Sequence, residues 1–592
     1  MPASRKAPSP APAAIHYLVE PAELHAHLFR VTLQIAQPAA VQRLSLPVWI
    51  PGSYLVREFS RHLQGLQARQ GRRAVPLQQL DKCSWEVLCD PAKPLTLVYE
   101  AYAFESSVRA AWLDTARAFF NGTSLCLRAH GHEQLPHALT LQATPATAHW
   151  SVATALAPVE TTRRGFGRYQ AADYDELVDS PVEMGEFWQR EFQAGGVPHR
   201  LVVAGAPASF DGERLLADTQ KICETAIRFW HGSKKPPMPR YVFLLNVVDE
   251  GYGGLEHRHS TALICGRRDL PRQGEAKRGE GYTTLLGLIS HEYFHTWNVK
   301  RLRPAEFARY DYAQENYTQL LWFFEGFTSY YDDLLLRRAG LLDDAAYLKL
   351  LNKGINQVLQ APGRALQSVA QASFDAWVKF YRPDENTPNA TVSYYSKGAL
   401  VALCLDLTLR HEGRTTLDEV MRALWSRCAG GPMGEADLAA VLAELGGRSF
   451  AKELGAWVHG TGELPLKTLL QQQGIAVLEE PSQMAQRLGL RVSEGPGLQI
   501  KTVLRGGAAE RAGLAAGDEW LGVEVGPKAI GGSWRLSKLD DLALYAGEHR
   551  RLTALVARDQ RLLRLPLTLP AAATTWRLAL REASQPRSWP AP

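Results

Sequence analysis

The sequence predicts a multidomain α+β protein, and two observations carry this prediction: its length and a change in hydrophobic period along the chain. At roughly 100–200 residues per domain, 592 residues correspond to about three or four domains. Apolar residues alternate with polar ones over much of residues 15–195, whereas from about residue 282 to 465 they recur at helical spacing. We therefore expect an N-terminal all-β domain, a mixed central domain with a helical half, and a small C-terminal domain.

The alternation is clearest in "LFRVTLQI", where Phe29, Val31 and Leu33 are separated by polar residues, as in a half-buried strand. The segments "LTLVYEAYAF" and "LTLQATP" have a similar pattern, with Pro and Gly between them. Residues 15–195 are therefore assigned to the N-terminal β domain. Residues 1–14 are rich in Pro and Ala, and we expect a disordered tail there.

The central domain is assigned to residues 196–468. It begins with a compact apolar strand, "YVFLLNVV", followed by a glycine-rich loop and a second strand, "STALIC". Farther on, "LLWFFEGFTSYYDDLLLRRAG" ends in two arginines and a glycine, which is typical of a helix C-terminus. Residues 469–570 then form strands around short glycine-containing turns, and residues 571–592 are expected to be a C-terminal tail.

Composition narrows the choice of partner and compartment. The net charge is only +5, from 66 basic and 61 acidic residues, and no segment concentrates Lys and Arg. We therefore expect neither nucleic acid nor a membrane surface as the main partner. The seven cysteines include no C-x-x-C pair, which argues against disulfides and against zinc held by cysteines. No apolar stretch is long enough for a membrane helix, so a cytoplasmic protein is expected, with a longer precursor left open.

The stretch "SHEYFHTW" contains the pattern His-Glu-x-x-His. On a helix, His291 and His295 lie on one face and can bind a single metal ion. Glu292 lies about 100° around the helix from His291, where it can act as a general base on a metal-bound water. The large apolar residues of this helix follow a different stripe, so the histidines are not simply core residues. The pattern predicts one zinc ion, although cobalt or manganese would accept the same ligands.

Catalytic zinc needs a third protein ligand, and Glu325 in "WFFEGFTSYY" is the best candidate. A carboxylate in such an apolar helical stretch is costly to bury unless it is paired or bound to a metal. The alternative is a surface-facing glutamate beside buried aromatic residues. Asp311 and Glu315 compete for the role but lie in the polar stretch "YDYAQENY", where a solvated loop explains them.

These motifs together resemble the gluzincin metallopeptidases, and within them the glycyl aminopeptidase family that has a C-terminal PDZ domain. The resemblance rests on H-E-x-x-H-x-W-N, on E-G-F-T-S-Y-Y thirty positions later, and on "PGSYLVREFSR" and "FFNGTSL" in the β domain. It implies a thermolysin-like zinc peptidase fold for residues 196–468 and a PDZ domain for residues 469–570. It also implies release of an N-terminal glycine or alanine from peptides.

An aminopeptidase has to bind a free α-ammonium group, and a fixed carboxylate is the natural partner for that cation. Glu256 in "GYGGLEHRHS" is similar in position to the glutamate that has this role in relatives, on a strand to which a peptide can add. Gly253 and Gly254 would let the peptide backbone approach, and His257 follows the glutamate as it does in the glycyl branch. The alternative for Glu256 is an ordinary strand carboxylate. A second metal at His257 and His259 is disfavoured.

Tyr395 in "SYYSKGALVAL" matches a Y-x-K-G element whose tyrosine donates to the oxyanion in relatives. The alternative is a buried tyrosine bonded to a backbone carbonyl, and Lys397 is expected to support local structure. At the C-terminal domain, "LGL" at residues 488–490 would begin a loop that holds a peptide C-terminus. A degenerate PDZ domain used for packing or for homo-oligomer contacts is an equal alternative.

The resulting prediction is a zinc-dependent aminopeptidase. Glu292 would remove a proton from the attacking water, Tyr395 would stabilise the oxyanion, and Glu256 would fix the register of a peptide with a free N-terminus. Two alternatives remain open at this point. One is an endopeptidase on the same zinc scaffold, and the other is a catalytically silent PDZ scaffold that only binds peptides.

Overall fold

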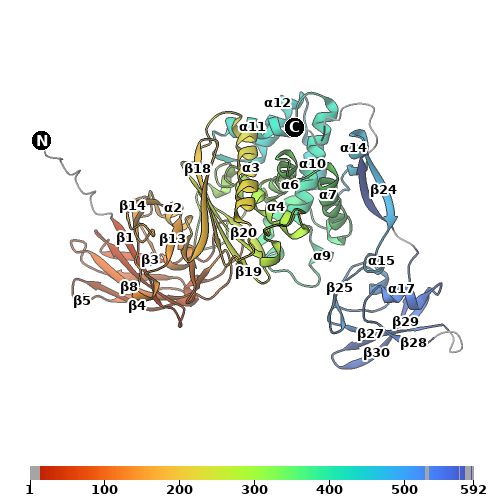
Figure 1. Cartoon of the computed structure of the whole chain (residues 1–592), viewed down its shortest axis with the longest axis horizontal. Coiled ribbons are helices and arrows are strands. Elements are labelled where there is room, and N and C mark those ends of the chain that lie inside the picture. The colour runs from red at the N-terminus through yellow and green to blue at the C-terminus, as the bar shows by residue number, and fades with distance from the viewer. Residues whose placement is uncertain (1–13, 527–531, 572–573, 581–588, 590–592) are drawn as a thin grey trace. The chain divides into compact units, whose positions relative to one another are not determined.

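The computed structural model describes residues 14–526, 532–571, 574–580 and 589 (Figure 1). The chain forms two compact units, Met1–Asn316 and Tyr317–Pro592. The predicted N-terminal tail lies outside the described residues except for residue 14. The predicted domain boundaries at 195 and 468 stay predictions.

The first unit begins with a β-rich region, as the alternating pattern predicted. Its eight-stranded sheet packs with two four-stranded sheets around one apolar core. In sheet order, the large sheet comprises β14 (Ala157–Thr161), β15 (Gly167–Ala171), β12 (His137–Leu141), β1 (Ile15–Glu23), β2 (Leu28–Ile35), β8 (Leu95–Tyr102), β4 (Leu63–Gln70) and β5 (Arg73–Ala74). The smaller sheets comprise β13 (Ser151–Thr154), β16 (Val182–Gly185), β10 (Arg117–Phe120) and β9 (Ala111–Leu113), and β11 (Arg128–Ala129), β3 (Val41–Ser45), β7 (Ser84–Leu88) and β6 (Leu77–Gln79).

A five-stranded mixed sheet completes the first unit. Its order is β17 (Phe187–Ala194), β18 (Val197–Ala204), β19 (Tyr241–Val248), β21 (Ser260–Gly266) and β20 (Tyr252–Glu256), so β20 is an edge strand. Helix α3 (Gly212–His231) packs on β17 and on α4 (Glu280–Phe294), and α4 in turn contacts β20 and β21 (Figure 1). The short helix α2 (Tyr174–Val178) precedes this sheet and belongs to the β-rich region.

The second unit begins with the predicted helical half. Its helices include α5 (Leu321–Phe324), α6 (Gly326–Arg338), α7 (Asp344–Leu359), α8 (Val369–Phe374), α9 (Thr387–Ala390), α10 (Tyr394–Glu412), α11 (Leu417–Arg427), α12 (Glu435–Gly446), α13 (Ala451–Leu454) and α14 (Leu466–Gln472). Helix α6 ends at the predicted arginines, and Gly340 follows with a φ of +71°, a conformation that favours glycine. Helices α5 and α6 both pack on α10.

A small β-rich region closes the second unit. Strands β25 (Leu490–Glu494), β26 (Leu498–Val503), β27 (Glu519–Val525), β29 (Arg551–Arg558) and β30 (Arg561–Thr568) form one sheet in that order, and β28 (Gly532–Arg535) also pairs with β27. Three short helices accompany this sheet: α15 (Met484–Leu488), α16 (Ala508–Arg511) and α17 (Asp541–Ala546). Their apolar side chains form a separate core.

The described part of the predicted C-terminal tail is ordered, which differs from the expectation for residues 571–592. Strand β31 (Thr574–Leu580) pairs with β24 (Ile475–Pro481), and the fully buried Trp589 donates a hydrogen bond from Nε1 to the Tyr330 hydroxyl at 3.0 Å. The strand forms because β24 offers an open edge to the segment "TTWRLAL". A Pro-rich composition at the very end of the chain concealed this pairing.

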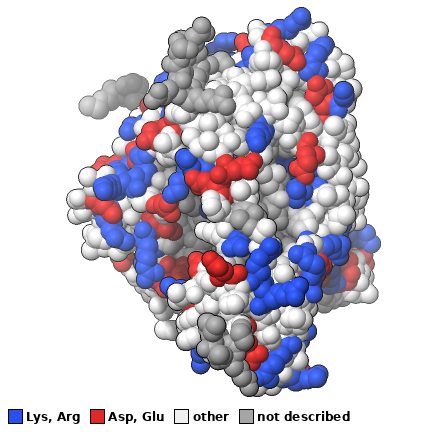
Figure 2. Space-filling model, turned by 90° about the vertical axis from the view of Figure 1, so that its right-hand side faces the viewer, with Lys and Arg blue, Asp and Glu red and all other residues white. Residues whose placement is uncertain are grey.

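Charged side chains of both signs, separated by uncharged surface, are visible on the face shown in Figure 2. Among the described residues, no helix combines the length and the apolar character that a membrane crossing requires.

Candidate metal centre and substrate site

The two motif histidines lie at the end of α4. His295 is 1% exposed and follows the last residue of the helix, and His291 lies one turn before it. Their Nε2 atoms are 3.1 Å apart, and the two rings are almost perpendicular. Both Nε2 atoms therefore face a common point, as the helical spacing predicted.

A backbone carbonyl orients the second histidine. Nδ1 of His295 lies 2.8 Å from the carbonyl oxygen of Asn298, to which the protonated Nδ1 donates. The Nε2 lone pair is then left facing His291, which is the tautomer that a metal requires. The chain turns back tightly at this point, because the Lys300 N–H donates to the carbonyl of His295 and Val299 has a φ of +99°. The Nε2 atoms of His291 and His295 therefore fit a divalent cation.

Glu292 lies directly against strand β20. A Cβ atom added to Gly254 would be 2.1 Å from Oε1 of Glu292, so no residue larger than glycine fits without moving this carboxylate. The sequence predicted that Gly253 and Gly254 let a peptide approach. In the structure, residue 254 must be glycine because Glu292 lies against it. Contact of Gly253 and Gly254 with a peptide stays a prediction.

Glu256 ends strand β20 and is only 4% exposed. Glu256, Glu292 and His295 each offer a ligand atom, and these atoms lie within 4.8 Å of one another. The loop of "PGSY" also contacts Glu256, since a Cβ on Gly52 would be 2.4 Å from its Oε1 and Gly52 has a φ of +93°. The predicted amine anchor therefore lies beside the predicted general base.

Two residues of the β-rich region hold β20 and the turn that follows it. Nη2 of Arg109 donates to the carbonyl of Gly254 at 3.1 Å. Nδ1 of His257 lies 3.2 Å from Oδ1 of Asp179, and the His257 side chain is buried. The role of His257 towards substrate stays a prediction, and the contact that the structure shows is with Asp179.

In the second unit, Glu325 occupies the junction of α5 and α6 and is 2% exposed. Tyr395 lies in the first turn of α10. Glycines allow α6 and α10 to approach closely, because a Cβ on Gly326 would be 2.6 Å from the backbone of Gly398. The E-G and Y-x-K-G motifs, about seventy positions apart in the sequence, are therefore packed together.

Burial raises the pKa of Tyr395 well above its usual value, and the Glu325 carboxylate raises it further. The hydroxyl therefore keeps its proton at neutral pH and can donate a hydrogen bond. Tyr394 stacks on Tyr395 with ring centroids 4.8 Å apart and is fully buried, whereas Tyr395 is partly exposed. This difference favours Tyr395 as the hydroxyl that a substrate reaches. Lys397 is buried, in keeping with a structural role.

Comparisons with known proteins identify the family of the chain. The family model of the Peptidase M61 N-terminal domain matches residues 16–186, and that of the M61 glycyl aminopeptidase matches residues 284–401. An aminopeptidase N family protein from Idiomarina loihiensis is 38% identical, with a TM-score of 0.90, and the match covers 96% of this chain and 98% of that one.

The chain belongs to the M61 glycyl aminopeptidase family. An M1 zinc metallopeptidase from Deinococcus radiodurans is 18% identical with a TM-score of 0.48, and the match covers 76% of this chain and 94% of that one. No curated protein matches the sequence.

As an M61 glycyl aminopeptidase family member, the protein is a zinc metallo-aminopeptidase, a hydrolase with a zinc cofactor. This confirms the predicted family, enzyme class and cofactor. The second matched range contains the His-Glu-x-x-His motif, Glu325 and Tyr395. Glu256 lies between the two matched ranges, and neither range extends beyond residue 401.

Sequence reasoning missed four residues that surround the site: Gly52, Arg109, Asp179 and Lys300. "PGSY" was noticed only as a family feature, and a turn glycine gives no indication of the distant side chain that it contacts. Arg109 and Asp179 are single charged residues in a region of strands, so no local pattern distinguishes them. For Lys300 the sequence offered one indication, its position five residues after His295, and only the structure shows that it is buried.

The contact between Gly254 and Glu292 predicts a specific loss of activity. Gly254→Ala should lower kcat by about a hundredfold, because its Cβ displaces a catalytic carboxylate by a distance on the order of 1 Å. The measurement is kcat on a glycyl-anilide, with zinc content as a second readout that should not change. Gly462→Ala is the control, since an added Cβ there would meet nothing within 4 Å. Unchanged kcat in Gly254→Ala would contradict the contact.

Proposed function

We propose that this enzyme releases the N-terminal residue, glycine or alanine, from peptides with a free amino terminus. The observation that carries the proposal is the position of Glu256, a buried carboxylate at the end of an edge strand and beside Glu292. A carboxylate at this position can bind the α-ammonium group of a peptide whose backbone pairs with β20. The preference for small residues rests on the family, whose description names glycine.

We propose that His291, His295 and Glu325 hold the zinc ion. The converging Nε2 atoms of the histidines support the first two ligands. Burial supports the third, because metal coordination offsets the desolvation of a carboxylate that is 2% exposed among aromatic residues. When bound, zinc activates a water molecule and polarises the scissile carbonyl.

Three side chains of this chain then carry out proton transfer, oxyanion stabilisation and binding of the amino terminus. Glu292 takes a proton from the attacking water and passes it to the departing amine. The protonated hydroxyl of Tyr395 donates a hydrogen bond to the oxyanion. Glu256 binds the α-ammonium group and so fixes which peptide bond reaches Glu292. An endopeptidase would not need this last interaction. Membership of an aminopeptidase family argues against both the endopeptidase and the catalytically silent scaffold.

We propose that residues 469–570 form a PDZ domain. The support is an edge strand, β25, which follows the turn at Gly489 and lies near the helical segment of α17, since Oε1 of Glu494 accepts from the Leu539 N–H at 2.9 Å. A peptide C-terminus could pair with β25. A labelled peptide with a free C-terminal carboxylate should bind, and its amidated twin should not. Equal binding or no binding of both would favour packing or homo-oligomer contacts instead.

A cytoplasmic location is also part of the proposal. All seven cysteines lie in the described part of the chain and are free thiols, and five of them are buried. Free thiols in these numbers are typical of a reducing compartment.

The amine-anchor role of Glu256 predicts a difference between two substrates. The wild type should cleave a glycyl-anilide and spare its N-acetylated twin, because acetylation removes the cation that Glu256 binds. Glu256→Gln should raise KM for the glycyl-anilide by about a hundredfold. Glu250→Gln, at an exposed position in the preceding loop, should leave KM unchanged.

Glu292→Gln is the inactive reference in this experiment. If the wild type cleaves both anilides at similar rates, the enzyme is an endopeptidase or a broader amidase, and Glu256 has been misassigned.

The ligand role of Glu325 predicts a loss of metal. Glu325→Gln should purify with much less zinc and should bind added zinc at least about tenfold more weakly, because a carboxylate ligand is lost. Zinc content per protein, measured by atomic absorption, checks this. Glu315→Gln, which changes the rejected candidate, should keep full zinc. A zinc-replete Glu325→Gln would show that another residue is the third ligand.

A further inference from the structure

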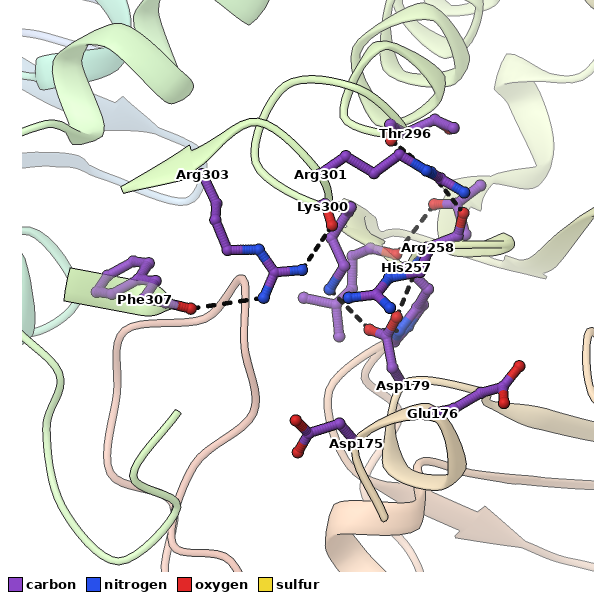
Figure 3. A network of polar contacts seen from close by, with 12 residues as sticks. Asp175, Glu176, Asp179, His257, Arg258, Thr296, Lys300, Arg301, Arg303 and Phe307 are labelled. Carbon is purple, nitrogen blue, oxygen red and sulfur yellow. Dashed lines mark hydrogen bonds and ion pairs between the residues drawn. The ribbon is translucent and has the colours of Figure 1, made fainter. Parts of the chain in front are cut away.

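Asp179 joins three segments behind the proposed amine anchor. It follows α2, and its carboxylate accepts a hydrogen bond from Nδ1 of His257 at 3.2 Å, from the N–H of Arg258 at 2.8 Å, and from Nζ of Lys300 at 2.7 Å. Figure 3 shows Asp179 pointing at the turn that follows β20 and at Lys300. One carboxylate thus connects the β-rich region, the strand that ends in Glu256 and the loop that follows the zinc-binding histidines.

The Lys300 side chain is only 3% exposed. Its backbone is fixed, because its N–H donates to the carbonyl of His295 and its own carbonyl accepts from Nη2 of Arg303 at 2.7 Å. Arg301, the next residue, donates to the carbonyls of Thr296 and Arg258, at 2.6 and 3.2 Å (Figure 3). The buried ammonium group of Lys300 is therefore held against Asp179, in the loop that follows His295.

The negative charge of Glu256 also acts on this ammonium group. Burial lowers the pKa of Lys300, but Asp179, Tyr310 and Glu256 together outweigh burial and raise it. Lys300 and Asp179 also line a cavity of about 30 Å³ together with Ile50 and Pro51, and the next residue in that loop, Gly52, contacts Glu256. In the structure Lys300 pairs with Asp179, and Glu256 is a further carboxylate whose charge acts on the ammonium group.

We propose that Asp179 is a positioning residue that keeps the Lys300 ammonium away from Glu256, so that Glu256 stays open to the α-ammonium group of the substrate. The proposal rests on the proposed role of Glu256. Its basis is that a lysine side chain and a peptide N-terminus present the same chemical group. A buried ammonium group that loses its partner is strongly destabilised, and it turns to the next available carboxylate. Without Asp179, Lys300 competes with substrate.

Asp179→Asn tests the positioning role of Asp179, because asparagine has nearly the same shape as aspartate. The amide oxygen of the substituted side chain can still accept from the Arg258 N–H, whereas the negative charge that holds Lys300 is lost. KM for the glycyl-anilide should rise at least tenfold, with kcat within threefold and zinc content unchanged, because the change affects binding of the amine. Asp175→Asn is the matched control. Asp175 lies on α2, which Asp179 follows, and lines the same cavity, but its partner is the Tyr312 hydroxyl, so KM should not change.

The double variant Asp179→Asn with Lys300→Met separates competition from loss of structure. If Lys300 competes with substrate, removing it returns KM to within threefold of the wild type. Removing both partners of a buried ion pair is also tolerated better than removing one, so this variant serves if Asp179→Asn is unstable. Melting temperature checks folding of every variant.

Two results would overturn the inference: an unchanged KM in folded Asp179→Asn, or a double variant whose KM stays at least tenfold above the wild type. In the second case Asp179 only holds the turn after β20. Failure of the proposed function itself has a different signature. There, wild type fails to discriminate the free amine from its acetylated twin, or Glu256→Gln leaves KM unchanged.

Discussion

Two buried carboxylates, Glu256 and Glu292, are held within 4.8 Å of each other and of His295, and the architecture of the first unit depends on keeping them there. At an effective dielectric constant of about 20, two unit charges about 5 Å apart repel each other by about 3 kcal/mol. Packing that fixes both side chains and cations nearby both help to hold two ionised carboxylates together. Lys300 contributes positive charge that acts on Glu256, and the proposed zinc ion would contribute more.

Close packing at two glycines also keeps Glu256 and Glu292 in place. Glu292 comes from a helix and Glu256 from an edge strand, and the strand approaches the helix closely only because residue 254 has no side chain. Gly52 likewise allows the loop of "PGSY" to lie close to Glu256. Arg109 then holds the strand by its backbone. The β-rich region is thus part of the proposed substrate site, since it contributes Gly52, Arg109 and Asp179.

In the second unit, glycines also allow two segments to pack closely. Gly326 follows Glu325 directly, and Gly398 closes the Y-x-K-G element, so each motif contains the glycine that lets its helix approach the other. Burial raises the pKa of the Tyr395 hydroxyl, and the charge of the Glu325 carboxylate raises it further. Motifs that first suggested only ligands and donors therefore also encode how two helices pack.

Features that depend on local spacing could be predicted from the amino-acid sequence alone. A four-residue interval on a helix fixed the pairing of His291 with His295, and the change of hydrophobic period located the β-rich and helical regions. The apolar surroundings of Glu325 indicated the third ligand, and the family resemblance added Glu256 and Tyr395. Only the tertiary structure could show that Gly254 makes room for Glu292, that His257 contacts Asp179, or that Asp179 pairs with a lysine 121 positions away. Those contacts join distant segments, and no periodicity in the chain records which strand edge will meet which helix end.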